Sequence, residues 1–469
     1  MWITKQLPEI SAPTLGAIFR SRLKCLNISS STIKITFDND EDGTRVMVIR
    51  ESGRLSNIWQ LIDATITSSP CFRISHALDD GTSEFELTCR NNGKEMREIE
   101  LCSSTWTNEN FKSFADRLGS SHFCSSLKVD ADKVVASLDI LTSISSQFPY
   151  LKRLELIVSK CSQSHVSLLL AMRQLVHIKV IVHYRDPVTA IPPDELEGFA
   201  AIEEMERAAG TLARVIPAVL HYESTSRPYL VFDVPEYDAD AVFFFFLSMR
   251  NPYLEKIDIR MANFYGRNLA PLQELKHLKE VRLCISSTMT MAVEMVGSLL
   301  TGFKNESLLF ELKTNRMRNE VVAEIHGHKL TKISITQEMD WESTQSNNWP
   351  RLLSQFSSLV ELELNGVCFG HNVICKNRRL RNLTWDKLDD DALISFSENL
   401  PSLECVSCFD STNVTTSGLL TLMRGKARHC LRRIDVPLSG RNLDAKILTE
   451  EVRTIQKDTN RKLLLFIGM

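Results

Sequence analysis

The chain has 469 residues, of which 43% are hydrophobic and 24% are charged, so it can bury a large core and is not intrinsically disordered. Its 55 Lys and Arg against 58 Asp and Glu give a formal net charge of -3, which disfavours nucleic-acid binding through bulk positive charge. The 12 cysteines are scattered and the first residues hold no long apolar run, so we expect a cytoplasmic or nuclear protein whose partners include neither a membrane nor a nucleic acid.

The N-terminal region, residues 1–95, is predicted to contain β-strands. Residues 32–37 and 45–49 are rich in β-branched residues and flank a turn at 38–43, a pattern that indicates a β-hairpin. Residues 84–87 suggest a further strand. We therefore expect a strand-containing cap ahead of the rest of the chain.

From residue 96 onward a six-residue phrase recurs, in the form apolar-x-x-apolar-x-apolar. Its weaker copies begin at Met96, Cys124, Leu151 and Leu175. After these the repeat is interrupted at about residues 186–228, where several prolines precede a helical pattern that Asp194 would cap. We interpret this segment as a helical insertion between repeats.

The second half of the chain carries the regular copies of the phrase, with a mean spacing of about 25 residues. They begin at Leu254, Leu278, Leu330, Leu359, Leu380, Leu403 and Leu431, with a degenerate copy at Ser307. The last apolar positions of each copy alternate as in a strand, and the connecting stretches, such as 242–249, 269–275, 352–356 and 392–396, are expected to be helical. Units of this kind bury their apolar faces only by stacking. Residues 96–469 are therefore predicted to form an α/β fold, a curved leucine-rich-repeat solenoid with parallel strands on the concave face and helices outside.

The concave face is the candidate binding surface, because the third and fifth residues of each phrase point away from the core. A rigid strip of polar side chains suits the binding of another protein, since little ordering is required. The alternative is a merely solvated sheet face. The candidate protein-binding residues are Lys256, Asp258, Glu280, Arg282, Lys332, Glu361, Glu363, Asn382, Arg433 and Asp435.

Two C-terminal units carry a more specific pattern. In the first, Leu388 and Asp390 precede a helical Ala392-Leu393, and Asn399-Leu400-Pro401 leads to the next phrase; in the second, Val414-Thr415 and Gly418-Leu419 precede Cys430-Leu431. Both resemble the cysteine-containing leucine-rich repeat. That repeat is common in F-box/leucine-rich-repeat subunits of cullin-RING ubiquitin ligases. The resemblance implies a substrate-recognition subunit whose partners include a cullin and its adaptor subunit.

Residues 5–23 look like the opening of an F-box, with Leu7-Pro8, Leu15 and Ile18-Phe19, although the hairpin predicted from residue 32 takes the place of its later helices. Two hypotheses remain. The chain is an SCF-type ligase receptor that holds its protein substrate on the concave face, or it is a structural or regulatory partner of a small GTPase or cytoskeletal assembly without ligase attachment.

No catalytic, metal or cofactor site is expected. Cys405-x-x-Cys408 has no second pair, and its register places Cys408 in the core and Cys405 outside it. His326 and His328 are interpreted as a polar turn before a strand, and the acidic run 389–391 as a helix cap. An enzyme is the least favoured hypothesis, because no catalytic motif is present.

Overall fold

The computed structural model describes the strands and helices of the repeats and the strands that precede them. The chain divides into two compact units, unit 1 comprising residues 1–237 and 245–251 and unit 2 comprising residues 238–244 and 252–469. The predicted boundary at residue 95 lies inside unit 1 and remains a prediction. The described residues are 23–29, 32–37, 45–50, 72–77, 83–91, 97–103, 106–118, 124–182, 207, 228–235, 237, 243–244, 247–248, 251–262, 264, 266–286, 293–314, 320–336, 353–367, 370–408, 413–437 and 443–468.

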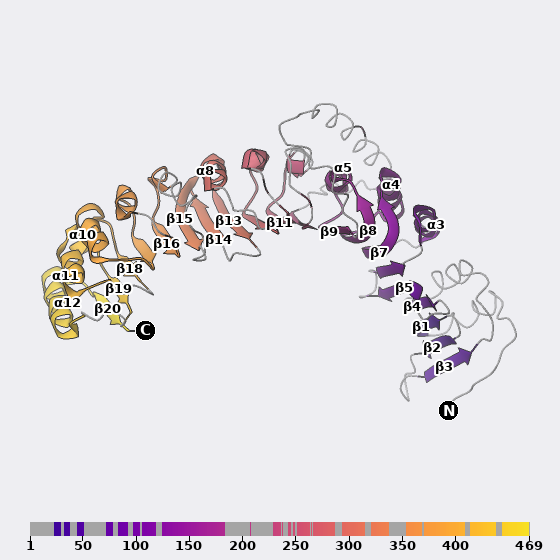
Figure 1. Ribbon diagram of the computed structural model, residues 1–469, viewed down its shortest axis with the longest axis horizontal. Helices are drawn as coiled ribbons and strands as arrows, with labels where there is room; N and C mark the ends of the chain where they lie inside the picture. The colour runs from indigo at the N-terminus through magenta and orange to yellow at the C-terminus, as the bar shows by residue number, and fades with distance from the viewer. Residues whose placement is uncertain are drawn as a thin grey trace. The chain divides into compact units, whose positions relative to one another are not determined.

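Unit 1 begins with strands that pair mostly antiparallel (Figure 1). The β1–β2, β2–β3, β4–β5 and β5–β6 pairs are antiparallel, and β1 also pairs parallel with β4. The β2–β3 pair is the hairpin expected from the sequence, and the expected strand at 84–87 lies within β5. The strands are β1 (Leu23–Ser29), β2 (Thr32–Phe37), β3 (Arg45–Arg50), β4 (Phe72–Ala77), β5 (Ser83–Asn91) and β6 (Arg97–Ser103).

From β6 onward, unit 1 alternates strands and helices. Each of β6 to β9 pairs parallel with the next strand, a pairing that requires a crossover connection. The elements are α3 (Asn108–Leu118), β7 (Cys124–Ala136), α4 (Leu138–Gln147), β8 (Arg153–Cys161), α5 (Gln163–Leu168), the 3₁₀ helix η1 (Leu169–Ala171), β9 (His177–Val182) and β10 (Tyr229–Val234).

The core of unit 1 follows the weak copies of the phrase. Leu127, Val129, Leu154 and Leu156, which occupy the alternating apolar positions of two phrases, are buried. Beneath α3, the rings of Trp106 and Phe114 pack edge to face with centroids 5.4 Å apart. The phrases at Met96, Cys124, Leu151 and Leu175 therefore mark true repeats.

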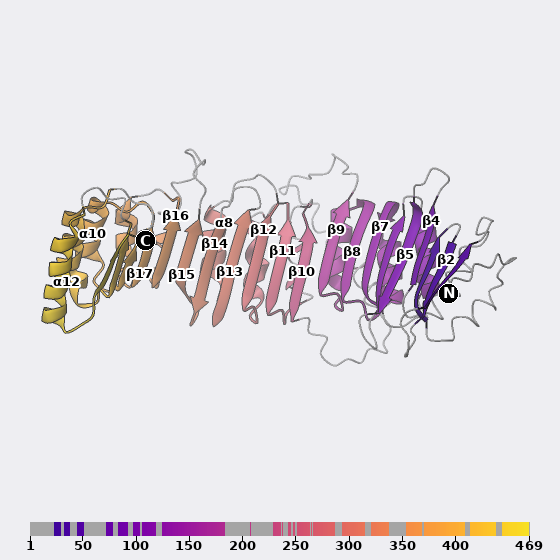
Figure 2. The same ribbon diagram turned by 90° about the horizontal axis from the view of Figure 1, so that it is seen from below.

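In unit 2, strands also lie side by side in the order of the chain (Figure 2). The expected strand segments pair in register: Ile257 lies beside Val281, Leu362 beside Leu383, and Val406 beside Ile434. All of these segments run in one direction, as predicted. The strands are β11 (Lys256–Met261), β12 (Glu280–Ile285), β13 (Ser307–Thr314), β14 (Glu320–His326), β15 (Lys329–Thr336), β16 (Glu361–Asn365), β17 (Asn382–Trp385), β18 (Cys405–Ser407), β19 (Arg433–Val436) and β20 (Leu464–Ile467).

One repeat of unit 2 differs from the prediction, because the segment between β13 and β15 contains a strand and not a helix. Strand β14 pairs antiparallel with both neighbours, and a two-residue turn at Gly327 and His328 joins it to β15. Both turn residues have positive φ, as a tight hairpin of this kind requires. The interpretation of the His326–His328 stretch as a turn before a strand is correct.

Apart from the β14 hairpin, the described connections between strands of unit 2 contain α-helices or 3₁₀ helices on the side opposite the strand face. In Figure 1, α10, α11 and α12 stack against one another behind β18 to β20. The expected helix at 392–396 lies within α10, and the one at 269–275 is largely a 3₁₀ helix. Of the expected helix at 352–356, residues 353–356 are described, and among these only Leu353 is helical. The elements are η2 (Gly266–Glu274), α8 (Val293–Gly302), η3 (His371–Lys376), α10 (Asp390–Asn399), α11 (Thr416–Arg424), η4 (Lys426–His429) and α12 (Ala445–Thr459).

Polar side chains of unit 2 satisfy backbone groups at a helix start and between successive repeats. Asp389 accepts a hydrogen bond from the backbone N–H of Ala392 at 2.8 Å and caps α10, so the acidic run is a helix cap as expected. Buried Asn305 donates to the carbonyls of Leu275 and Leu278, at 3.1 and 3.0 Å, and so satisfies backbone groups of the preceding unit. The Asn305 side chain thus links two successive repeats of unit 2.

Two predicted segments fall largely on residues that the structure does not describe. The F-box-like opening at 5–23 reaches the described residues only at Leu23, which begins β1. The predicted insertion at 186–228 includes the described residues Arg207, in a helix, and Pro228. Its other residues lie outside the described set.

Candidate protein-interaction face

The strand face of unit 2 is the surface formed by the side chains of β11 to β20 that point away from the helices. Along β11 and β16 every second residue is buried and the residues between them are exposed or partly exposed, as a half-buried strand requires. The candidate residues chosen from the sequence all lie on this face, and none of them is buried. Their assignment to partner binding remains a prediction.

At the β11–β12 end, the candidate residues neutralise one another across the strands. Lys256 lies 3.0 Å from Glu280, and Arg282 lies 2.7 Å from the same carboxylate. Arg282 also reaches Glu311 on β13 at 3.4 Å. Hydrogen bonds from Lys313 to Glu311 and Glu320 raise the pKa of Lys313. Cross-strand pairs of this kind stabilise a sheet and leave little uncompensated charge.

A second ion-pair group centres on Lys332 of β15. Its ammonium lies 3.2 Å from Glu324 of β14 and 3.6 Å from Glu361 of β16. Burial lowers the pKa of Lys332, but the hydrogen bond to Glu324 and the charge of Glu361 outweigh it, so the net shift is upward. Glu361 also accepts a 2.9 Å hydrogen bond from Asn382 of β17.

Glu363 is the exception on this strip, because it is exposed and has no ion-pair or hydrogen-bond partner among the described residues. Its register neighbours are Ser334 on β15 and Thr384 on β17, neither of which carries charge. Its sequence neighbour two positions back is Glu361. The β15–β17 stretch therefore presents acidic charge that the fold itself does not neutralise.

At the end of the strip, Arg433 lies in a small cluster with aromatic and acidic side chains. Its Nε donates to both oxygens of Asp435, at 3.0 and 2.8 Å, and its guanidinium lies 5.0 Å from the ring centroid of Phe466 on β20. Ser407 donates to Asp435 at 3.0 Å. Stacking and pairing together fix the orientation of Arg433.

The structure thus gathers the candidate residues into separate groups instead of one continuous site. Strands β13 and β14 separate Arg282 from Lys332, and β18 separates Asn382 from Arg433. Sequence reasoning missed Glu324 and Phe466, which complete two of the groups. A signal for β14 was present, since the apolar residues Val321, Ala323 and Ile325 fall at every second position immediately before a Gly-containing turn.

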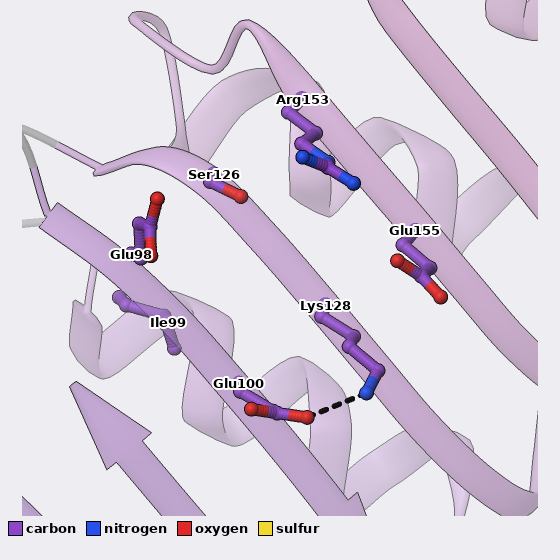
Figure 3. A pocket seen from close by; sticks show the side chains of 7 residues that line it. All are labelled: Glu98, Ile99, Glu100, Ser126, Lys128, Arg153 and Glu155. Atoms are coloured by element: carbon purple, nitrogen blue, oxygen red, sulfur yellow. Dashed lines mark hydrogen bonds and ion pairs between the residues drawn. The ribbon is translucent and has the colours of Figure 1, made fainter. Parts of the chain in front are cut away.

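The strand face of unit 1 carries a similar pattern. A hollow is lined there by side chains of both charges, with Glu100 and Lys128 in contact at 2.5 Å and Arg153 and Glu155 on the neighbouring strand (Figure 3). The hydrogen bond to Glu100 raises the pKa of Lys128. On β9, Lys179 pairs with Glu155 at 2.9 Å. Because opposite charges alternate, this face favours no single sign of ligand.

Other chemistry expected or excluded from the sequence can be placed in the same way. Cys408 is buried and Cys405 is partly exposed, as the register predicted, and burial raises the pKa of Cys405. Within the described ranges, no group of three or more metal-ligating side chains comes together. None of the helices in the part of the chain that the structure describes is both long and apolar enough to cross a lipid bilayer.

Comparisons with known proteins give structural likenesses only. No protein-family model matches the chain, and a search of curated proteins gave no match. Similar solved structures include the Rad7 and Elc1 complex in yeast, at 14% identity and a TM-score of 0.28 over 76% of this chain and 82% of that chain. The Toll–Spatzle complex of Drosophila is similar at 11% identity and a TM-score of 0.31, over 82% of this chain and 56% of that chain. The TLR13–ssRNA13 complex is similar at 9% identity and a TM-score of 0.29, over 74% of this chain and 48% of that chain.

These TM-scores are too low to establish a common fold, so the architecture rests on the strand register and the repeated phrase. Both units stack strand–helix repeats whose parallel strands share one face and whose buried positions fall on the phrase. The fold is that of a leucine-rich-repeat solenoid with helices outside.

Proposed function

We propose that the chain is a non-catalytic protein-interaction scaffold that holds a protein partner on the strand face of unit 2. The observation that carries this proposal is the uncompensated acid Glu363 on an otherwise self-neutralised strip. A basic side chain of a partner could form an ion pair with Glu363, as Lys332 does with Glu361. Such a contact costs the scaffold little, because the sheet is already ordered.

The partner-binding stretch is proposed to be β15 to β18. Beside Glu363 the face offers the hydroxyls of Ser334 and Thr384, which can donate or accept hydrogen bonds without loss of an internal ion pair. The β11–β12 stretch is less suited, because a partner there would compete with the pairs that Glu280 already makes.

The finer form of the proposal is a substrate-recognition subunit of a cullin-RING ubiquitin ligase. It is supported by the resemblance of the units over 388–436 to the cysteine-containing repeat. In these units Asp390, Thr415 and Gly418 form one connected cap. The alternative, a regulatory or structural partner of a GTPase or cytoskeletal assembly, shares the same strand face but needs no ligase adaptor.

Two sets of variants separate partner binding from ligase attachment. Affinity purification with mass spectrometry would compare the wild-type chain, Glu361→Lys with Glu363→Lys, and Leu15→Asp with Ile18→Asp in the F-box-like segment. The ligase hypothesis expects the first pair to lose the substrate and keep the cullin and adaptor, and the second pair to do the reverse.

A matched control carries the same charge change on the helix side, at Glu398→Lys and Glu450→Lys, both exposed. Absence of any cullin from the wild-type sample favours the alternative without ligase attachment. If a folded Glu361→Lys/Glu363→Lys variant keeps every partner, the strand face is a solvated surface and the scaffold proposal for it fails.

A further inference from the structure

The last strand of unit 2, β20, differs from the strands before it. In β19 the inward side chains Ile434 and Val436 are 0% and 4% exposed. Their register partners on β20, Leu465 and Ile467, remain only partly buried. The apolar core under β20 is therefore not fully covered by the described residues.

The backbone of β20 also presents an unpaired edge. Leu464 N–H donates to the carbonyl of Arg432 at 2.8 Å, and Gly468 N–H to that of Val436 at 3.0 Å. Because successive residues of a strand direct their backbone groups to opposite sides, those of Leu465 and Ile467 point away from β19. Among the described residues β20 pairs with no strand but β19. The same two residues thus offer both apolar side chains and unpaired backbone groups.

A cationic hollow lies at the start of β19 and β20. It is lined by Arg432, Arg461 and Lys462, with no acidic side chain in the lining. Arg432 is partly compensated by Glu404 at 3.3 Å, and Arg461 donates to the carbonyl of His429 at 2.7 Å. Lys462 is exposed and makes no ion pair with a described residue. The hollow therefore favours a negatively charged group next to the open edge.

We propose that the β20 edge binds an extended acidic segment of a protein partner, which adds to the sheet as one further strand. Its alternate apolar side chains would cover Leu465 and Ile467, and its carboxylates would enter the hollow formed by Arg432, Arg461 and Lys462. Strand addition of this kind draws affinity from main-chain hydrogen bonds and specificity from the flanking pockets. The site is distinct from the strand face proposed above.

In the proposed parallel geometry, charge favours an acidic partner over a second copy of this chain. A second copy that continued the parallel sheet would place its own Arg461 and Lys462 beside the first pair, and like charges at close range oppose association. In parallel addition the acidic residues of the partner precede its apolar residues in sequence, because the hollow lies at the N-terminal end of β20.

The test measures fluorescence anisotropy of the full chain with three end-blocked, labelled peptides. The first has Asp-Glu before Thr-Val-Thr-Val-Thr, the second has Lys-Lys in place of Asp-Glu, and the third carries Glu-Asp at the C-terminal end. We expect the first peptide to bind about tenfold or more tightly than the second at low salt, with the difference shrinking as salt rises. A preference for the third peptide over the first would assign antiparallel addition and overturn the parallel geometry.

Two variants separate the backbone edge from the charge. Leu465→Pro removes an edge N–H that β19 does not use, so the β19–β20 pairing is retained while strand addition is lost. Arg461→Glu with Lys462→Glu should reverse the preference between the acidic and basic peptides. The control is Lys446→Glu with Arg453→Glu on α12, which carries the same charge change on exposed residues outside the hollow.

Equal binding of the acidic and basic peptides, or no binding of any peptide at millimolar concentration, would overturn the proposal. So would unchanged binding by a folded Leu465→Pro variant, with folding checked by circular dichroism. If Leu465→Pro does not fold, the test rests on the Arg461→Glu/Lys462→Glu variant, and an unchanged preference between the acidic and basic peptides overturns the proposal. A concentration-dependent dimer that Leu465→Pro abolishes would assign the edge to a second copy and also overturn it.

Discussion

Asp390 and Thr415 join two successive repeats of unit 2. The Asp390 carboxylate accepts hydrogen bonds from the backbone N–H of Thr415 at 2.8 Å and from its hydroxyl at 2.5 Å. Thr415 is itself the N-cap of α11. Gly418 allows this approach, because a Cβ there would lie 2.1 Å from the nearer Asp390 oxygen. The neighbouring Asp390 carboxylate thus explains why residue 418 is a glycine.

We expect Gly418→Ala and Asp390→Ala each to lower the free energy of unfolding by about 1–3 kcal/mol, the usual range for a lost cap or buried hydrogen bond. Their effects should not add, because the first change displaces the carboxylate that the second removes. Urea unfolding of the single and double variants measures this coupling. Gly370→Ala is the matched control, since no atom lies within 4 Å of its added Cβ. Additive effects would contradict the proposed contact.

Leu362 tests the inward register of the strands. Its side chain is 2% exposed on β16, between Ile333 and Leu383. Leu362→Ala should cost about 2–5 kcal/mol through the cavity that it leaves. Glu363→Ala, one residue along the same strand, should leave the melting temperature nearly unchanged. A thermal melt in which both variants behave alike would show that the register is wrong.

The two acids on β16 should differ in their effect on stability. Glu361→Lys places an ammonium beside Lys332 and loses the hydrogen bond from Asn382, so a cost of up to about 1 kcal/mol is expected. Glu363→Lys breaks no pair within the described residues and should be neutral for folding. Partner affinity measured with the purified single variants should rank in the opposite order, with the larger loss at Glu363.

Glu451 gives unit 2 a pH dependence. Arg424 on α11 donates to both oxygens of this α12 carboxylate, at 3.0 and 2.7 Å, and the hydrogen bond lowers the pKa of Glu451. A pKa depressed in the folded state adds stability above the unfolded value, and the gain is lost as pH falls through the folded pKa.

Glu451→Gln should therefore be less stable than the wild type at neutral pH, by less than about 1 kcal/mol because Arg424 is largely exposed. The difference should shrink as the pH falls below about 4.3, the ordinary value for Glu. Denaturant unfolding across this range measures it, with exposed Glu398→Gln as the control. A difference that stays constant with pH would exclude an electrostatic cause.

The inward register of the strands was predictable because buried positions must repeat wherever strands stack on one core. Which strands pair side by side was not predictable from the phrase. The phrases at Ser307 and Leu330 suggested neighbouring strands, but β14 lies between them, so Lys332 pairs with Glu324 on a strand that the repeat does not contain. Strand β10 was missed because its apolar residues, Leu230, Phe232 and Val234, lack the two-residue gap of the phrase. Alternation fixes which side a residue faces, but not which residue lies beside it.

The β14 hairpin has a consequence for the order in which unit 2 folds. Pairing β14 with β15 closes only the two-residue turn at Gly327 and His328, whereas each parallel pair needs a full crossover before any bond forms. Contacts between near neighbours in sequence form fastest, and repeat arrays grow outward from wherever they start. We therefore expect β13 to β15 to act as the nucleus from which the flanking repeats propagate in both directions. Pulse-labelled hydrogen exchange should find the β14 amides protected before those of β11 and β19, and Gly327→Ala should slow folding.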